Sequence, residues 1–186
     1  THPEVKKYIE RVVKQFVDWG FELLKIDFTY PVCFSKKYFV PMTRAQALRL
    51  GYANIRKAAG NKIHLLSAIT QLSPLVGIVD SARVGIDTIN PNMANYPLIG
   101  KIVNGFMLKE NLRNSRTRNF LNEKVWINDA DCYVGRKGVG LTKAQSDEHF
   151  EFIKGSGGSV WIGDSFKYMS KTSLDKYVEL FKKPEK

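Results

Sequence analysis

Apolar positions recur along this chain in two patterns, one typical of amphipathic helices and one typical of short buried strands. From Val5 to Val17 the apolar side chains fall three or four residues apart, which predicts a helix that ends near Gly20. The following run from Phe21 to Phe28 is short and mostly apolar, and it predicts a strand. A helix followed by a strand therefore opens the chain.

The same alternation continues to the C-terminal end. Two Thr-x-x-Gln sequences, at Thr43 and Thr142, are capping boxes that predict helix starts, because both side chains bind backbone amides left free there. Another helix is predicted over residues 96–120, with Pro97 in its first turn. A last helix is predicted to be capped by Thr172 and to bury Leu174, Tyr177, Val178 and Phe181. Further strands are predicted at residues 62–69, 78–83, 125–128 and 159–162.

Strands that alternate with helices predict a parallel sheet with right-handed crossovers. No glycine pattern of a dinucleotide site or a P-loop follows any of these strands, so a nucleotide-binding doubly wound sheet loses its main support. We therefore predict an α/β fold, a parallel (β/α) barrel of the TIM type with about five βα units present. With 186 residues and 44% hydrophobic content, residues 1–186 are expected to form one barrel domain with no second domain.

Composition and charge narrow the setting. The chain has no apolar run of about 18 residues and no signal-peptide pattern, so we expect no membrane partner and a cytoplasmic protein. Cys33 and Cys132 form no zinc-binding cluster, and we interpret both as free thiols in a reducing compartment. The net charge of +11 raises nucleic acid as a partner, but the basic residues are scattered and no nucleic-acid-binding motif occurs. We therefore predict no nucleic-acid partner.

The first predicted strand ends in Lys25-Ile26-Asp27. Because side chains alternate along a strand, Lys25 and Asp27 are expected to point the same way, with Leu24, Ile26 and Phe28 packed on the other side. A lysine there would keep the neighbouring carboxylate ionised, which makes Asp27 a candidate nucleophile at the carboxyl end of a barrel strand. The alternative is a surface ion pair in a turn.

Carboxylates also follow the later strands. Asp87 comes after the third strand, Asp129 and Asp131 after the fourth, and Asp164 closes the fifth. Because the carboxyl ends of parallel strands meet on one rim, these acids are expected to converge, as the two carboxylates of a glycosidase do. Helix capping or a turn is the alternative for each of them.

Arg83 lies four residues before Asp87. Its guanidinium offers several donors in a fixed fork and could bind a sugar hydroxyl beside the acid. The alternative is an ion pair with Asp80 or Asp87.

Four segments together resemble the α-galactosidases of glycoside hydrolase family 36. They are Lys25-Ile26-Asp27-Phe28, Ser73-Pro74 with Gly77-Ile78-Val79-Asp80, Arg83-Val84-Gly85-Ile86-Asp87-Thr88, and Trp126-Ile127-Asn128-Asp129-Ala130-Asp131-Cys132 with Arg136. The order of the segments and the separation of the two main aspartates (87 − 27 = 60) agree with that family. The resemblance covers nearly the whole chain.

The resemblance implies a retaining α-galactosidase, with Asp27 as nucleophile and Asp87 as acid/base. It implies that Lys25 and Arg83 bind sugar hydroxyls, and that Asn128, Asp129 and Asp131 shape the floor of the site. It implies an α-galactoside oligosaccharide as the substrate, and neither a metal nor an organic cofactor. If the mechanism is retaining, the two carboxyl groups are expected to lie roughly 5 to 5.5 Å apart.

The sequence departs from the family pattern in three places. Gln71 stands where a cysteine is usual, which leaves a side chain that can still bind a sugar, and Ala130 replaces a proline. The resemblance also covers only strands four to eight of an eight-stranded barrel, so the residues that hold galactose on the first three strands are missing. We therefore expect a fragment of a larger enzyme, or a chain completed by its N-terminal part or by a second copy, because an open half-barrel leaves sheet edges unpaired. Alone, it should have little or no activity.

Three alternatives stay open at this point. A galactosyltransferase of the raffinose-synthase kind shares these motifs and differs in the acceptor that reaches the intermediate. An inactive fragment or remnant would at most bind sugar. A basic nucleic-acid binder would bind any duplex in a salt-sensitive way.

Overall fold

The computed structural model describes residues 1–182. Apart from the last predicted strand, helices and strands follow one another as the sequence predicts, with short 3₁₀ helices in several loops. The α-helices are α1 (Pro3–Asp18), α2 (Arg44–Ala59), α3 (Pro97–Thr117), α4 (Lys143–Ser156) and α5 (Lys171–Phe181). The strands are β1 (Leu23–Ile26), β2 (His64–Ser67), β3 (Ser81–Arg83) and β4 (Ile127–Asp129).

The four strands form one sheet in the order β1-β2-β3-β4. Strand β2 pairs in parallel with both of its neighbours: Leu23 to Ile26 of β1 face His64 to Ser67 of β2, and Leu66 of β2 faces Ser81 of β3. The predicted parallel α/β sheet is therefore confirmed. Leu65 and Leu66 of β2 are completely buried, as expected for a run of Leu residues with sheet neighbours on both sides.

The fifth strand, predicted at residues 159–162, is wrong as a continuous strand. Two isolated parallel bridges take its place, Asp129 with Ser159 and Tyr133 with Ile162. The bridges are three residues apart on one segment and four on the other, so the ladder cannot continue in register. Asp131 lies between the bridges with φ of +70°, a left-handed conformation that breaks an extended strand.

The described chain divides into two compact units. Unit 1 contains residues 1–83 and 125–127, and unit 2 contains residues 84–124 and the chain from Asn128 onward.

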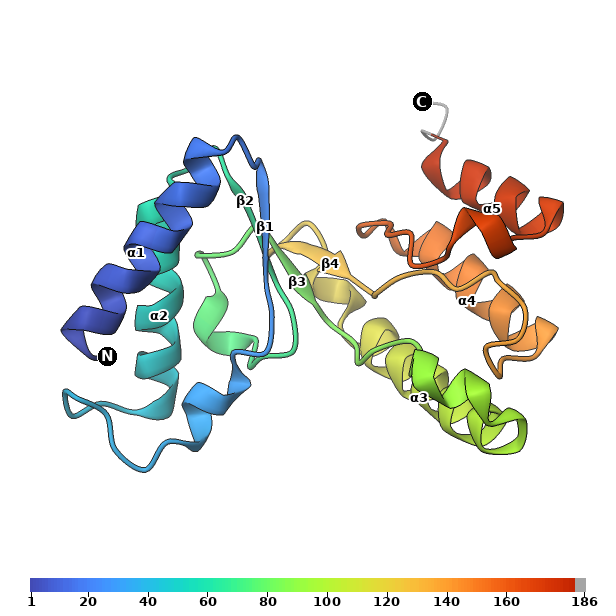
Figure 1. Ribbon diagram of the computed structural model, residues 1–186, viewed down its shortest axis with the longest axis horizontal. Coiled ribbons are helices and arrows are strands. Elements are labelled where there is room, and N and C mark those ends of the chain that lie inside the picture. The colour runs from blue at the N-terminus through green and yellow to red at the C-terminus, as the bar shows by residue number, and fades with distance from the viewer. Residues whose placement is uncertain (183–186) are drawn as a thin grey trace. The chain divides into compact units, whose positions relative to one another are not determined.

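In unit 1, helices α1 and α2 pack against each other on one side of strands β1 and β2 (Figure 1). The capping box predicted at Thr43 is confirmed: Thr43 Oγ1 accepts from Gln46 N at 3.2 Å, and Gln46 Oε1 accepts from Thr43 N at 2.9 Å. Gly60 ends α2 with φ of +74°. The apolar stripe of α1 is only partly buried, with Val13 inside and Val5 50% exposed, because α1 packs mainly on α2.

In unit 2, helices α4 and α5 enclose a small core of Tyr133, Phe150, Ile153 and Tyr177. The capping box at Thr142 is confirmed by the same two hydrogen bonds, at 3.2 and 2.9 Å. The start predicted for the last helix is wrong by two residues, because Ser170, and not Thr172, accepts from the Ser173 amide.

The predicted buried stripe of α5 is wrong for three of its four residues. Only Tyr177 is buried. Leu174, Val178 and Phe181 line an open apolar groove with Ile162 and Phe166.

Helix α3 of unit 2 buries polar side chains and exposes apolar ones. Leu98, Ile102 and Phe106 are all more than half exposed, whereas Asn104 and Asn111 are completely buried. The Asn104 amide binds the backbone of Asn90 and Val139, so the buried face of the helix holds loops in place. Pro97 occupies the first turn of α3, as predicted. Within residues 1–182, no helix has both the length and the apolar character needed to cross a bilayer.

Candidate functional site

The predicted nucleophile lies at the carboxyl end of β1 in unit 1. Lys25 is the third residue of the strand and Asp27 directly follows its last residue, and both side chains are exposed. Leu24 and Ile26 are half-buried, which agrees with the predicted alternation. The expectation that Phe28 packs with them is wrong, because its side chain is 61% exposed.

Three of the four strands are followed by a non-glycine residue in the left-handed backbone region. Phe28 (φ +56°), Ile69 (φ +43°) and Asp131 (φ +70°) each lie two residues beyond the last residue of β1, β2 and β4. This region is unfavourable for residues with a side chain, above all for a β-branched one. Residues with such strained backbone angles are common at functional sites. The backbone geometry of this chain therefore by itself indicates the strand ends as the candidate site.

Two side-chain hydrogen bonds anchor the loop after β1. Cys33 donates through Sγ to Oε1 of Gln71 at 3.2 Å, which connects this loop to the loop after β2. Thr29 Oγ1 and the hydroxyl of Tyr52, on α2, lie 3.0 Å apart. Burial raises the pKa of Tyr52, and the hydrogen bond from Thr29 opposes that shift, so Tyr52 is a neutral anchor at physiological pH.

Gln71, predicted to bind substrate, is exposed, and Cys33 binds the oxygen of its amide. The role of Cys33 was missed from the sequence, where it was interpreted only as a free thiol. Its distance of 38 residues from Gln71 gave no signal of contact.

Arg83 is the last residue of β3 and is 8% exposed. One of the two acids considered as its partner, Asp80, forms an ion pair with Arg56 of α2. The Asp80 carboxylate also accepts from the Leu65 amide of β2 at 2.7 Å. Arg56 in turn donates to the carbonyl oxygens of Ile78 and Ile63, so Asp80 belongs to the structural framework of unit 1.

In unit 2, Asp87 is half-buried in the loop after β3. The neighbouring residue, Thr88, donates its amide to Oδ2 of Asp131 at 2.7 Å and its hydroxyl to the carbonyl oxygen of Cys132 at 3.2 Å. Asp129 Oδ1 accepts from the Asp131 amide at 2.7 Å. Asp129 and Asp131, predicted to bind substrate, therefore also fix the backbone that carries Asp87.

Asn111 of α3 was not identified from the sequence. Its amide nitrogen donates to the carbonyl oxygens of Ile86 at 2.5 Å and Ala130 at 3.1 Å, and so bridges the loops after β3 and β4. A Cβ atom at Gly85 would lie 2.8 Å from that nitrogen, so only glycine fits beside it. The signal was available, since Asn104, Asn111 and Ser115 recur three or four residues apart around Leu108 on the predicted helix.

Asp164, included in the predicted rim of acids, has a structural role. Its side chain is 1% exposed, and Oδ2 accepts from the amides of Gly135 at 2.6 Å and Arg136 at 2.9 Å. The hydroxyl of Tyr177 donates to the same oxygen at 3.2 Å, and Arg136 lies 3.6 Å from the other. The turn alternative is therefore the one that fits Asp164.

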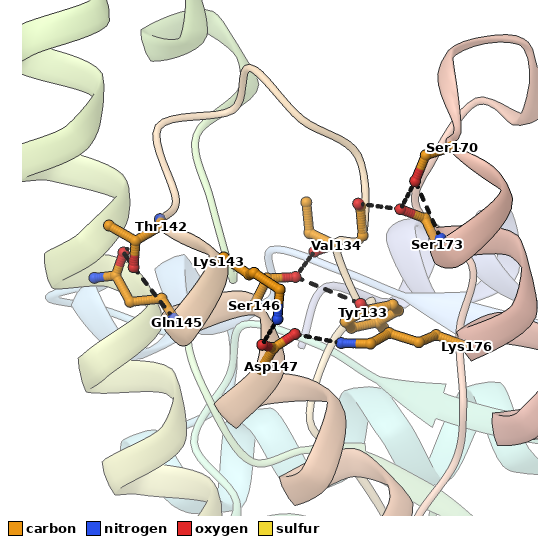
Figure 2. A network of polar contacts seen from close by, with 11 residues as sticks. Tyr133, Val134, Thr142, Lys143, Gln145, Ser146, Asp147, Ser170, Ser173 and Lys176 are labelled. Atoms are coloured by element: carbon orange, nitrogen blue, oxygen red, sulfur yellow. Dashed lines mark hydrogen bonds and ion pairs between the residues drawn. The ribbon is translucent and has the colours of Figure 1, made fainter.

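Helices α4 and α5 both hold the backbone of Val134 and Gly135 by hydrogen bonds (Figure 2). Ser146 of α4 donates to the carbonyl oxygen of Val134 at 3.1 Å, and Ser173 of α5 donates to that of Gly135 at 2.7 Å. Asp147 binds Lys143 and Lys176, each at 2.5 Å, and links the two helices. Hydrogen bonds to both lysines lower the pKa of Asp147.

The seven predicted site residues thus fall into two groups. Unit 1 carries Lys25, Asp27, Gln71 and Arg83, and unit 2 carries Asp87, Asp129 and Asp131. Within residues 1–182, no cluster of three or more His, Cys, Asp or Glu side chains is arranged to hold a metal ion.

The fold is shared with solved glycosidases. An α-galactosidase from Thermus thermophilus, solved with stachyose, superposes with a TM-score of 0.70 at 19% identity over 96% of this chain and 38% of its own. α-Galactosidase I from Mortierella vinacea gives 0.59 at 15% identity over 93% of this chain and 46% of its own. An isomalto-dextranase from Arthrobacter globiformis T6, solved with panose, gives 0.55 at 16% identity over 94% of this chain and 32% of its own.

No protein-family model matches the chain. The chain spans less than half the length of each of these three solved proteins. At such low identities the similarity shows a common fold. The chain therefore has the α/β fold of part of a glycosidase, and two of these three neighbours are α-galactosidases.

Proposed function

We propose that this chain is the part of a retaining α-galactosidase that carries its two catalytic carboxylates. The observation that supports this most directly is the position of Asp27, exposed at the carboxyl end of a parallel strand and followed by a strained residue. The fold shared with α-galactosidases and the Lys-x-Asp and Arg-x-x-x-Asp sequences agree with it.

In the proposed mechanism Asp87 begins protonated and Asp27 ionised. Asp27 attacks the anomeric carbon while Asp87 gives its proton to the glycosidic oxygen, so the bond to the leaving group breaks as the ester to Asp27 forms. Asp87, now ionised, takes a proton from water, whose oxygen attacks the anomeric carbon and releases Asp27. Two displacements return galactose with its original configuration.

The remaining residues have supporting roles in this proposal. Lys25 and Arg83 bind sugar hydroxyls, and Gln71 offers its amide to the same sugar. Asp131 holds the loop of Asp87 through the Thr88 amide. A retaining reaction requires the Asp27 and Asp87 carboxyl groups to lie about 5 to 5.5 Å apart in the assembled enzyme.

We further propose that other strands complete the barrel. Strand β1 is at the edge of the described sheet and pairs only with β2 there. Leu23, on this edge strand, is 38% exposed. An uncovered edge strand can accept another strand, which an upstream part of the parent protein or a second polypeptide would supply. The chain matches only 38% of the Thermus thermophilus enzyme, which leaves room for such a part.

Hydrolysis of p-nitrophenyl α-galactopyranoside tests the proposal. We expect turnover when the chain is combined with the upstream part of its parent protein, and little or none from the chain alone. Asp27→Asn should reduce turnover by at least about 10³-fold, because the nucleophile is lost while the shape is kept. Turnover that survives Asp27→Asn would contradict the assignment. A folded mixture with no turnover would favour a remnant that at most binds sugar.

A further inference from the structure

The loop after β1 carries a group of aromatic rings beside the proposed nucleophile. The rings of Phe28 and Tyr30 have centroids 5.7 Å apart, and those of Tyr30 and Phe34 are 5.5 Å apart. Phe28 is 61% exposed and Phe34 is 66% exposed. These three rings are called the aromatic platform below. Exposed aromatic rings in contact are costly in water, so a group of them marks a binding surface.

The backbone of the platform is strained at Phe28. Its φ of +56° is a left-handed conformation, which an aromatic residue adopts only when the surroundings impose it. The Phe28 amide donates to Oδ1 of Asp27 at 2.7 Å, so the carboxylate and the platform are fixed by the same turn. A ligand whose reacting atom lies at Asp27 therefore meets the turn that carries Phe28, the first ring of the platform.

The platform is held firmly from several sides. Its Tyr30–Phe34 segment is a 3₁₀ helix that begins after Thr29, which binds the Tyr52 hydroxyl at 3.0 Å. The hydroxyl of Tyr38 donates to the carbonyl oxygen of Val32 at 2.7 Å. Cys33, the buried residue of the same segment, donates to Gln71 at 3.2 Å. A surface that is fixed before binding loses little conformational entropy when a ligand arrives.

Cys33 also determines how the Gln71 amide is presented. Because the thiol binds Oε1, the oxygen is engaged and the amide nitrogen, with its two donors, is left for a ligand. Apolar rings on the same loop as the thiol that holds these donors match a neutral polyol ring, which has an apolar C–H face and hydroxyl oxygens at its edge. In a galactopyranose ring, the C–H groups at carbons 3, 4 and 5 form such a face, because the hydroxyl on carbon 4 is axial.

We propose that the aromatic platform binds one pyranose ring of an α-galactoside, and that Cys33 positions the Gln71 amide to donate to its hydroxyl groups. This inference rests on the proposed function, since that function supplies the class of ligand. The platform adds a sugar contact from this chain's own residues, and Cys33 is a positioning residue that acts through Gln71.

The test is to titrate the 186-residue chain with methyl α-D-galactopyranoside and to monitor binding by saturation-transfer NMR. We expect Phe28→Ala and Phe34→Ala each to weaken binding roughly two- to tenfold, as the loss of one aromatic contact does. Phe39→Ala is the matched control, because Phe39 is also 61% exposed but lies outside the platform, and its affinity should not change. Galactitol, which has the hydroxyl groups without the ring, should bind more weakly than the glycoside.

The role of Cys33 is tested by a conservative pair. Cys33→Ser keeps a donor and should retain binding within about twofold, whereas Cys33→Ala should weaken it. The Cys33→Ala loss should disappear in a Gln71→Ala background, since the thiol acts through that amide. A loss that persists without Gln71 would overturn the positioning role.

Failure of this inference can be told apart from failure of the proposed function. Unchanged affinity in Phe28→Ala and Phe34→Ala overturns the platform, even where Asp27-dependent hydrolysis is present. Absence of galactoside binding to the chain also overturns it. Binding that depends on the platform without any Asp27-dependent hydrolysis supports the platform and contradicts the enzymatic proposal.

Discussion

The polar side chains at the strand ends of unit 1 differ in role from the aspartates of unit 2. In unit 1, Lys25, Asp27 and Gln71 are exposed at the strand ends. In unit 2, Asp164 is buried and binds backbone amides, and Asp131 accepts from the Thr88 amide. An aspartate just beyond a segment of strand composition therefore has two different roles in this chain.

This difference shows why an aspartate near a strand end does not by itself identify a catalytic group. A buried carboxylate must replace its lost hydration with hydrogen bonds, and backbone amides in tight loops supply them. Such a residue becomes part of the framework. An exposed carboxylate stays hydrated and is open to a substrate, which is the state expected of a nucleophile before its substrate binds.

The largest expected effect is a difference in unfolding free energy between variants of a buried and of an exposed aspartate. Asp164→Asn should lower the unfolding free energy by about 3 kcal/mol, because Oδ2 accepts three hydrogen bonds inside the fold and a charged acceptor is lost. Asp27→Asn, at an exposed carboxylate, should change it by less than about 0.5 kcal/mol. Urea unfolding of the two variants gives both values. Equal losses would remove the distinction between the two kinds of aspartate.

The regular elements of both units could be predicted from the sequence because their signals are local. Thr43 with Gln46 and Thr142 with Gln145 form the capping boxes that their spacing predicts. The segment at residues 159–162 shows the limit of such local signals. Residues 159–162 have a strand composition, but the left-handed Asp131 on their partner segment prevents a continuous ladder.

The site was predictable only in part, for a physical reason. The positions of Lys25, Asp27 and Arg83 follow from strand ends that the apolar pattern marks. Contacts such as Cys33 with Gln71 and Asn111 with Ala130 join residues that are far apart in sequence. No periodicity encodes these pairs, because they depend on how loops meet after folding.

In the interior of unit 2, the side chain of His149 is completely buried. Both ring nitrogens lack a hydrogen-bond partner among the described residues, and burial lowers the pKa of His149 to about 4, although Asp131 and Glu148 oppose the shift. An unfolded histidine titrates near 6.5, so the unfolded chain binds more protons between these values and stability falls as pH falls from about 6.5 to 4.

Between pH 7 and pH 5, the wild-type chain should therefore lose about 2 kcal/mol more stability than His149→Phe, which cannot titrate there. His149→Leu should behave like His149→Phe and controls for the larger ring. His2 is exposed and its Nδ1 accepts from the Glu4 amide, an acceptor that the side-chain oxygen of Asn replaces, so His2→Asn should retain the wild-type pH dependence. The measurement is urea unfolding over this pH range, and the same slope in all four chains would exclude His149 as its source.

The two capping boxes provide a matched pair across the units. Their hydrogen bonds have the same lengths, so Thr43→Ala and Thr142→Ala should each cost about 1 kcal/mol of unfolding free energy. Thr43→Ser and Thr142→Ser should cost less, because the hydroxyl acceptor remains. Chemical denaturation with circular dichroism at the helix band measures both pairs. A large inequality between the two would show that the units respond differently even where local geometry is the same.

The smallest expected effect separates strain kept for function from strain of an ordinary turn. Phe28 and Glu123 are both exposed and left-handed, with φ of +56° and +59°, but only Phe28 follows a strand end. Glycine relieves the strain at either position and adds freedom to the unfolded chain, so each substitution should stabilise the protein by a net amount of about 0.5 kcal/mol. Glu123→Gly should leave galactoside binding unchanged, whereas Phe28→Gly should weaken it while raising stability. Phe28→Gly could instead stabilise the chain and leave galactoside binding intact. The left-handed residue at that strand end would then be a feature of the turn alone, and the main support for substrate binding at the exposed loop of unit 1 would be lost.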